Sequence, residues 1–217
     1  IPLGYAYNGM NTDDGHYLRQ TLDTIIDNNK ILHPKRSLKD HILEGYKLLR
    51  KLLAEQEDHS VVFIALGPET NLARLLISEA DEYSELDGKA LVAQKVKLLS
   101  VMGGLYGNEF DFPEWNIVND QITFKEWPTP IIASGWELGN KIRYPHQSIL
   151  NDFAGSYKHP LCVSYKIYQE MPYDRETWDL TSVLQAIEPG NNYFNLSEKG
   201  TITIDSIGQS IFSPSES

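Results

Sequence analysis

Three apolar runs along the chain predict the strands of a β-sheet. The run from Val61 to Leu66 is continuous and β-branched, which is typical of a strand buried on both faces. A second buried strand is expected at Lys97 to Met102, and a shorter third one at Pro130 to Ala133. Gly67 and Pro68 interrupt the first run, so the chain is expected to turn there.

Between and after these strands, apolar residues recur with the period of an α-helix. The predicted helices cover Ser37 to Glu57, Asn71 to Ala80, a helix ending within Thr123 to Trp127, Leu138 to Phe153, and Thr177 to Ile187. The first has capping-box spacing from Ser37 to Asp40, and Thr70 or Asn71 can cap the second. The residues expected to face inward are Ile42, Leu43, Tyr46, Leu49, Leu52 and Leu53, then Leu72, Leu75 and Leu76, and finally Leu180, Val183, Leu184 and Ile187.

Alternation of strands and helices indicates right-handed parallel crossovers. The expected fold class is α/β, with an open, mostly parallel sheet and helices on both faces, in a single domain covering residues 1–217. Thr201 to Asp205 alternates and, with Ile211-Phe212, predicts a C-terminal β-hairpin. Ile1 to Tyr7 is expected to be extended, and Ser213 to Ser217 to be disordered.

Composition narrows the class of protein. The 217 residues are 41% hydrophobic and 23% charged, which is typical of a soluble globular domain. The net charge of -11 argues against nucleic acid as a partner, because binding its backbone requires Lys and Arg. No run reaches the roughly 18 apolar residues of a membrane span. Cys162 is the one cysteine, so no internal disulfide can form, and its apolar neighbours favour a packing role.

The segment from Met102 to Asp120 carries the most informative polar residues. Gly103 and Gly104 end the second strand, and Asn108, Glu114 and Asn116 follow. Ligands of open α/β sheets bind at the carboxyl ends of strands, and carboxamides and carboxylates suit sugar hydroxyls, which both donate and accept hydrogen bonds. We therefore predict a pocket for a polar small molecule; the alternative is that these side chains bond their own loop backbone.

Two further positions admit a structural and a functional interpretation. Gly67-Pro68-Glu69-Thr70-Asn71 is typical of a tight turn that caps a helix, but it also leaves the Leu66 carbonyl at a strand end, where it could bind a hard cation. Asp179 could stabilise the start of a helix capped by Thr177, or it could be a metal ligand. The six histidines show no metal-ligand spacing.

Taken together, these segments resemble the inosine-uridine-preferring nucleoside hydrolase family over nearly the whole chain. Val61 to Leu75 is similar to the family's strand, turn and helix, which usually contain Gly-Pro-Leu-Thr-Asn. Met102-Gly103-Gly104, Asn108, Glu114-Trp115-Asn116 and Asp120 resemble its Met-Gly-Gly and Glu-Phe-Asn segments. Thr177 to Leu184 is similar to its late His-Asp helix, with Trp178 before the Asp, and Tyr193 to Asp205 to its closing hairpin.

The resemblance implies a nucleoside-salvage enzyme that cleaves the N-glycosidic bond of ribonucleosides, with calcium as cofactor. It implies that the Leu66 carbonyl and Asp179 bind the metal, and that Asn108, Glu114 and Asn116 bind ribose hydroxyls. Met102 would line the sugar site. Trp178 would stack on the base, because an indole cannot donate a proton in this pH range.

The family's N-terminal Asp-rich motif, which supplies the general base and most calcium carboxylates, is missing from this sequence. No catalytic residue is therefore assigned in this chain, and the general base is expected upstream of Ile1, which is not a Met. We expect the chain to be the C-terminal two-thirds to three-quarters of the fold, inactive alone, with an unpaired sheet edge that favours a homo-oligomer. The leading alternative is a non-catalytic nucleoside- or sugar-binding relative; a third is a hydrolase of other N-glycosides. The base and the compartment, cytoplasm or periplasm, stay open.

Overall fold

The computed structural model describes residues 1–7, 16–26, 30–31, 42–106, 116–153 and 158–215. The chain forms two compact units. Unit 1 comprises Ile1–Met10, Ile42–Lys141 and Trp178–Ser217, and unit 2 comprises Asn11–His41 and Ile142–Thr177. No helix among the described residues is long and apolar enough to cross a membrane.

Unit 1 is built on a three-stranded parallel sheet. Its strands are β3 (Val61–Ala65), β4 (Val96–Met102) and β5 (Ile131–Ser134), in the order β3-β4-β5. The three predicted strands are therefore confirmed. The expectation that the first strand is buried on both faces is wrong: β3 lies at the sheet edge, is half-buried, and leaves Ile64 36% exposed.

Helices cover both faces of this sheet, as the alternation of elements predicted. On one face, Leu99 and Val101 of β4 belong to a core formed with α2 (Gly45–Ala54), α3 (Thr70–Leu76), α4 (Gly88–Lys95) and α5 (Ile117–Glu126). On the other face, the Ser100 hydroxyl donates to the Ser182 carbonyl of α9 (Trp178–Ile187) at 2.8 Å. Alternate residues of a strand point to opposite faces, so Met102 shares the α9 face with Ser100.

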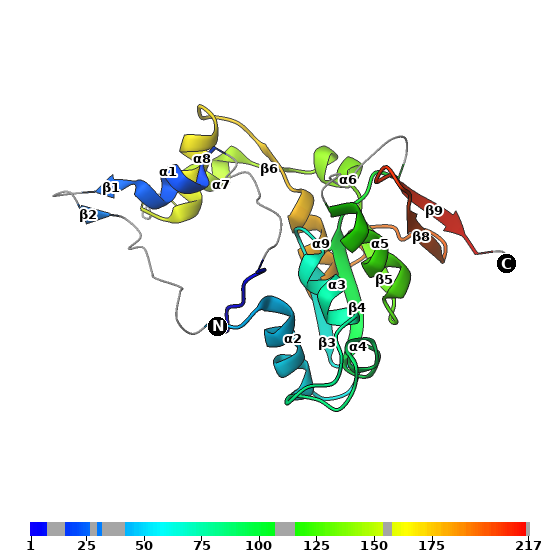
Figure 1. The fold of residues 1–217 in the computed structure, drawn as a ribbon. Coiled ribbons are helices and arrows are strands. Elements are labelled where there is room, and N and C mark those ends of the chain that lie inside the picture. Colours follow the sequence, from blue (N-terminus) through cyan, green and yellow to red (C-terminus); the bar gives the residue numbers. More distant parts are fainter. Residues whose placement is uncertain (8–15, 27–29, 32–41, 107–115, 154–157, 216–217) are drawn as a thin grey trace. The chain divides into compact units, whose positions relative to one another are not determined.

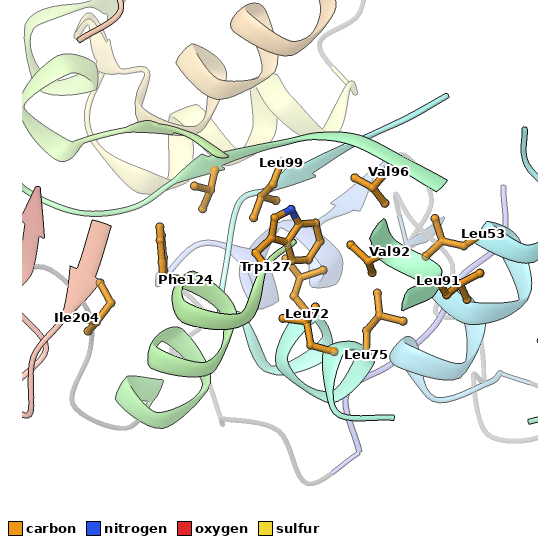
Figure 2. Close-up of a cluster of buried hydrophobic side chains, with 12 residues drawn as sticks. Leu53, Leu72, Leu75, Leu91, Val92, Val96, Leu99, Phe124, Trp127 and Ile204 are labelled. Carbon is orange, nitrogen blue, oxygen red and sulfur yellow. The ribbon is translucent and has the colours of Figure 1, made fainter. Parts of the chain in front are cut away.

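The core of unit 1 has one large aromatic residue at its centre. Figure 2 shows Trp127 between the β4 residue Leu99 and the helical residues around it. Its indole N–H donates to the Thr129 hydroxyl at 2.9 Å, which satisfies its polar atom. The buried hydrophobic residues of this core are Leu53, Leu72, Leu75, Leu76, Leu91, Val92, Val96, Leu99, Val101, Phe124, Trp127 and Ile204.

Two predicted helices begin or end elsewhere. α2 begins at Gly45, and the predicted cap Ser37 lies outside the described residues. Residues 42–44 are not helical, because the backbone there pairs with Tyr5: Tyr5 N–H donates to the Leu43 carbonyl, and Gly45 N–H donates to the Tyr5 carbonyl. α3 ends at Leu76, short of the predicted Ala80, although its inward residues are buried as expected.

The predicted inward face of α9 is wrong for Leu180 and Ile187, whereas Val183 and Leu184 are half-buried. Thr181 and Ser182 are the buried residues of this helix, whereas Leu180 is 50% and Ile187 64% exposed. Small side chains let a helix backbone approach the sheet closely enough for the Ser182 carbonyl to bond with Ser100. Close approach therefore decides the face that α9 buries.

The C-terminal hairpin is confirmed. β8 (Gly200–Ile204) pairs with β9 (Ser210–Pro214), and the hairpin packs beside α5 (Figure 1). Gln121 of α5 donates from Nε2 to the Ile204 carbonyl at 3.2 Å and to the Asp205 carbonyl at 2.9 Å. Because β9 runs to Pro214, the expectation of disorder from Ser213 onward is wrong for its first residues.

Unit 2 is small and mainly helical. It contains α1 (Leu18–Asp23), α7 (His146–Asn151), α8 (Pro160–Tyr168) and the strand pairs β1 (Ile25–Ile26) with β2 (Lys30–Ile31) and β6 (Arg143–Tyr144) with β7 (Arg175–Glu176). The long helix predicted from Leu138 to Phe153 is divided into α6 (Trp136–Lys141), in unit 1, and α7. Pro145, at the N-cap of α7, explains the division, since proline disfavours helix both at its own interior position and before it. Cys162 is buried, which fits the packing role.

Candidate functional site at the carboxyl edge of the sheet

Two of the predicted site residues lie next to each other at the carboxyl ends of parallel strands. Leu66 follows β3, and Met102 ends β4, its neighbour in the sheet. The register pairs Ala65 with Val101, so the two residues occupy adjacent positions on this edge. Leu66 is 42% exposed and Met102 half-buried. Carboxyl edges of this kind are where open α/β folds bind ligands.

The Met-Gly-Gly turn is anchored to the next strand and helix. Gly103 N–H donates to the Ser134 carbonyl at 3.1 Å, and Trp136 N–H donates to the Gly104 carbonyl at 2.8 Å. Gly104 has a φ of 93°, a region that favours glycine. A Cβ on this residue would lie 2.4 Å from the Tyr106 ring. The second glycine is therefore required by backbone conformation and by packing.

The start of α9 lies at the same edge. The helix meets the middle of β4 through Ser182 and Ser100, and its first residue, Trp178, stacks on Trp136 with ring centroids 6.4 Å apart and an interplanar angle of 27°. Trp136 is itself bonded to Gly104. Gly139 of α6 permits this packing, because a Cβ there would lie 2.3 Å from the Trp178 Cα.

Asp179 occupies the first turn of α9, where the helix dipole favours a negative charge. Its side chain is exposed on the molecular surface, but the surrounding protein desolvates the carboxyl group enough to raise its pKa. Among the described residues, no basic side chain opposes this shift. A cation bound next to Asp179 would therefore stabilise the charged form of its carboxyl group.

Asn116 lies at the starts of two helices on the other face. It precedes α5, is 3% exposed, and its Oδ1 accepts from the Thr70 hydroxyl at 3.4 Å and from Asn119 Nδ2 at 3.0 Å. Its Nδ2 donates to Asp120 Oδ1 in a short hydrogen bond. These contacts use one of the two hydrogens on Asn116 Nδ2. The second hydrogen is left to donate a further hydrogen bond.

Two buried acids next to Asn116 were missed as site residues by sequence reasoning. Glu69, at the N-cap of α3, is 3% exposed, and Asp120 is fully buried. Burial, together with the charge of Asp120, raises the pKa of Glu69 to about 8. Burial raises the pKa of Asp120 to about 7, partly offset by the Asn116 hydrogen bond. The one sequence signal was Glu69 itself, which replaces the Leu of the Gly-Pro-Leu-Thr-Asn pattern.

The structure thus brings Leu66, Met102, Trp178 and Asp179 to one edge of the sheet, with Asn116 buried at the helix starts on the opposite face. Asn108 and Glu114 lie outside the described residues. Trp136 was not predicted, and its stacking on Trp178 could not be read from a pattern. Within the described part of the chain, no group of three or more His, Cys, Asp or Glu side chains could hold a metal.

The fold resembles those of several solved structures. No protein-family model and no curated protein sequence matches the chain. Among solved structures, a plant nucleoside hydrolase is similar with a TM-score of 0.68 and 15% identity, over 99% of this chain and 69% of its own. A purine-preferring ribonucleoside hydrolase from Gardnerella vaginalis has a TM-score of 0.65 and 12% identity, over 98% and 68%. An inosine-uridine-preferring nucleoside hydrolase from Bacillus anthracis has a TM-score of 0.58 and 17% identity, over 82% and 60%. The chain therefore has the α/β fold of nucleoside hydrolases.

Proposed function

We propose that this chain forms the sugar- and metal-binding side of a nucleoside hydrolase site, in a protein that hydrolyses the N-glycosidic bond of ribonucleosides to base and ribose. One observation carries the proposal: the Leu66 strand end and the Met102 turn are adjacent at the carboxyl edge of the sheet, and the helix that carries Asp179 begins beside Trp136, which is bonded to the turn at Gly104. Site residues on separate elements that converge at a carboxyl edge are the expected arrangement for ligand binding in this class of fold.

Calcium fits the chemistry of the donors but not their number. A backbone carbonyl and a carboxylate are hard oxygen ligands of the kind calcium prefers. The raised pKa of Asp179, with no basic partner to lower it, also suits a cation neighbour. Calcium takes roughly six to eight oxygens, so Leu66 and Asp179 would supply only part of its coordination. When bound, the ion would polarise a water molecule and the sugar hydroxyls.

The chain's own residues would then bind and orient the substrate. Met102 provides an apolar wall beside the sugar, and the remaining Asn116 amide hydrogen can donate to a hydroxyl. The Trp178 indole, stacked on Trp136, offers an aromatic surface for a base. Attack of water at C1′ with departure of the base requires a group that takes a proton from the water, and no residue of this chain is assigned that role. We therefore expect binding without turnover.

Isothermal titration calorimetry with ribose, inosine and uridine, each with and without calcium, tests this function. The wild-type chain should bind ribose in a calcium-dependent way, and Asp179→Asn should lose the calcium dependence. Glu79→Gln, an exposed acid outside the site, is the matched control and should bind as the wild type does. Absence of sugar binding under both conditions would refute the proposal, and release of free base by the chain alone would refute the expected inactivity.

A second function is favoured by the Trp136 and Trp178 stack. A pair of stacked indoles can bind a nucleoside base but cannot protonate it. A nucleoside- or sugar-binding protein without catalysis would therefore keep this site. In that case inosine would bind with greater affinity than ribose, Trp136→Ala would abolish the difference, and turnover would stay absent when the chain is tested with any segment that completes the fold.

A further inference from the structure

Glu69 and Asp120 are two buried acids with unsatisfied oxygens. Glu69 Oε2 and Asp120 Oδ2 are buried and accept no hydrogen bond within the described residues. α3, which Glu69 precedes, packs against α5, which carries Asp120. Two negative charges brought together away from water repel each other, so at least one acid of such a pair is expected to keep its proton.

Among the described residues, no basic side chain compensates this pair. α3 packs against α2, α4 and α5, and α5 also packs against β8. The other basic side chains on these elements form ion pairs with other acids: Arg50 with Asp81, Arg74 with Glu44, Lys89 with Glu126, Lys95 with Asp58 and Lys125 with Glu126. Lys47 and Lys51 of α2 are the remaining basic side chains of these elements, and neither acts on either acid. Glu69 and Asp120 therefore reduce their combined negative charge by binding a proton.

Asp120 also connects this pair to the predicted sugar site. Its Oδ1 accepts the Asn116 Nδ2 hydrogen, while Thr70 and Asn119 hold Asn116 Oδ1. An ionised carboxylate accepts a stronger hydrogen bond than a neutral acid does. The charge on Asp120 therefore governs how firmly the Asn116 amide is held and where its second hydrogen points.

We propose that Asp120 is a positioning residue for Asn116, and that Glu69 and Asp120 bind protons as a coupled pair, so that the orientation of the Asn116 amide follows the protonation of both acids. Coupled acids titrate in two steps that belong to the pair. The raised pKa values of the two groups, to about 7 and about 8, place both steps near neutrality. The effect on sugar binding rests on the proposed function; the effect on Asn116 itself does not.

The first test needs no ligand. The side-chain amide signal of Asn116, assigned by its loss in Asn116→Ser, is followed by NMR between about pH 5 and pH 9. In the wild type it should shift in two steps. In Glu69→Gln only the lower step should remain, and in Asp120→Asn the signal should no longer titrate. A signal that is independent of pH in the wild type, or an unchanged upper step in Glu69→Gln, would overturn the proposal.

The second test measures ribose affinity over the same range. The wild-type affinity should rise as Asp120 ionises, and Asp120→Asn should bind about tenfold more weakly with no pH dependence. Glu79→Gln should behave as the wild type. If the wild type binds no sugar at any pH but its Asn116 signal titrates in two steps, the proposed function fails while the coupled pair stands. Should Asp120→Asn not fold, Glu69→Gln alone still decides the point.

Discussion

Unit 1 contains two buried charged sites that are built in opposite ways. Arg50 is fully buried, and its guanidinium donates to both Asp81 carboxylate oxygens, at 2.6 and 3.0 Å. It also donates to the Ser78 hydroxyl at 2.9 Å, and to the carbonyls of Ser84 and Leu86 at 3.2 and 2.9 Å. Glu69 and Asp120 each keep a buried oxygen that has no hydrogen-bond partner in the described part of the chain. A charge that serves the fold is thus fully paired, whereas the unpaired acids adjoin the candidate site.

The two sites differ in which protonation state the fold favours. Arg50 lowers the pKa of Asp81, so the fold favours the charged form of that acid. Burial raises the pKa of Glu69 and of Asp120, so the fold disfavours the charged forms of these two acids. Groups with strongly perturbed pKa values gather at functional sites more often than elsewhere. The contrast supports a functional rather than a stabilising role for the acid pair.

The largest expected effect is from Arg50→Met. Removing the guanidinium leaves Asp81, Ser78 and two carbonyls without their donor, and breaking a buried pair of this kind costs about 3–5 kcal/mol of unfolding free energy. Urea denaturation followed by circular dichroism measures the loss. Lys51→Met, on the exposed side of the same helix, is the control and should change little. Equal stability of the two variants would show that the Arg50 contacts contribute nothing.

Asp81→Asn should destabilise the fold by about 2 kcal/mol, less than Arg50→Met because Asp81 is partly exposed. The stability that Asp81 contributes has a defined pH dependence. Its pKa is lowered in the fold, so this contribution is present above the ordinary value of 3.8 and is lost as the pH falls through the folded value. Denaturation at acidic and neutral pH should therefore show the wild type and Asp81→Asn converging in acid.

Glu69→Gln should change the free energy of unfolding in the opposite direction. It should stabilise the fold at about pH 8 by about 1–2 kcal/mol. The pKa of Glu69 is raised from 4.5 to about 8, so the stability associated with its protonated form is fully present below 4.5 and is lost as the pH rises through about 8. The advantage of the variant should vanish near pH 4 and grow with pH. A wild type that is as stable as Glu69→Gln at the alkaline end would contradict the contrast between the two sites.

The smallest effect is expected from Ser78→Ala. This change removes one acceptor of Arg50 and the bond from the Ser78 hydroxyl to the Leu75 carbonyl, for a loss of about 1 kcal/mol. Combining Ser78→Ala with Arg50→Met in a double-mutant cycle measures whether the two side chains interact, since contacting residues should show a coupling energy. Strict additivity would indicate that Ser78 and Arg50 stabilise the fold independently.

The strands of unit 1 could be predicted because their signal is local. A run such as Val61 to Leu66 favours a strand through its consecutive β-branched and apolar residues, and the parallel order follows from the alternation with helices. The face of α9 could not be predicted in the same way. Periodicity follows apolar side chains, whereas Thr181 and Ser182 are buried because they are small and let α9 approach β4.

The positions of Met102, Leu66 and Asp179 could be predicted, because a strand end or a first helical turn follows from the local sequence, and their roles stay predictions. The candidate site was not predictable where it depends on a contact between distant segments. Glu69 and Asp120 are 51 positions apart (120 − 69) and become a pair only when α3 packs on α5. The start of α2 was missed for the same reason, since Tyr5 changes the backbone before Gly45.

The contacts of Arg50 also affect how a protease would meet this chain. The segment between α3 and α4 runs over the surface and has the polar, acidic composition of a favoured cleavage site. A protease must draw several residues into an extended conformation before it can cut. Arg50 binds this segment at Ser78, Asp81, Ser84 and Leu86, close to both of its ends. We therefore expect one buried side chain to protect an exposed loop from digestion for as long as α2 stays folded.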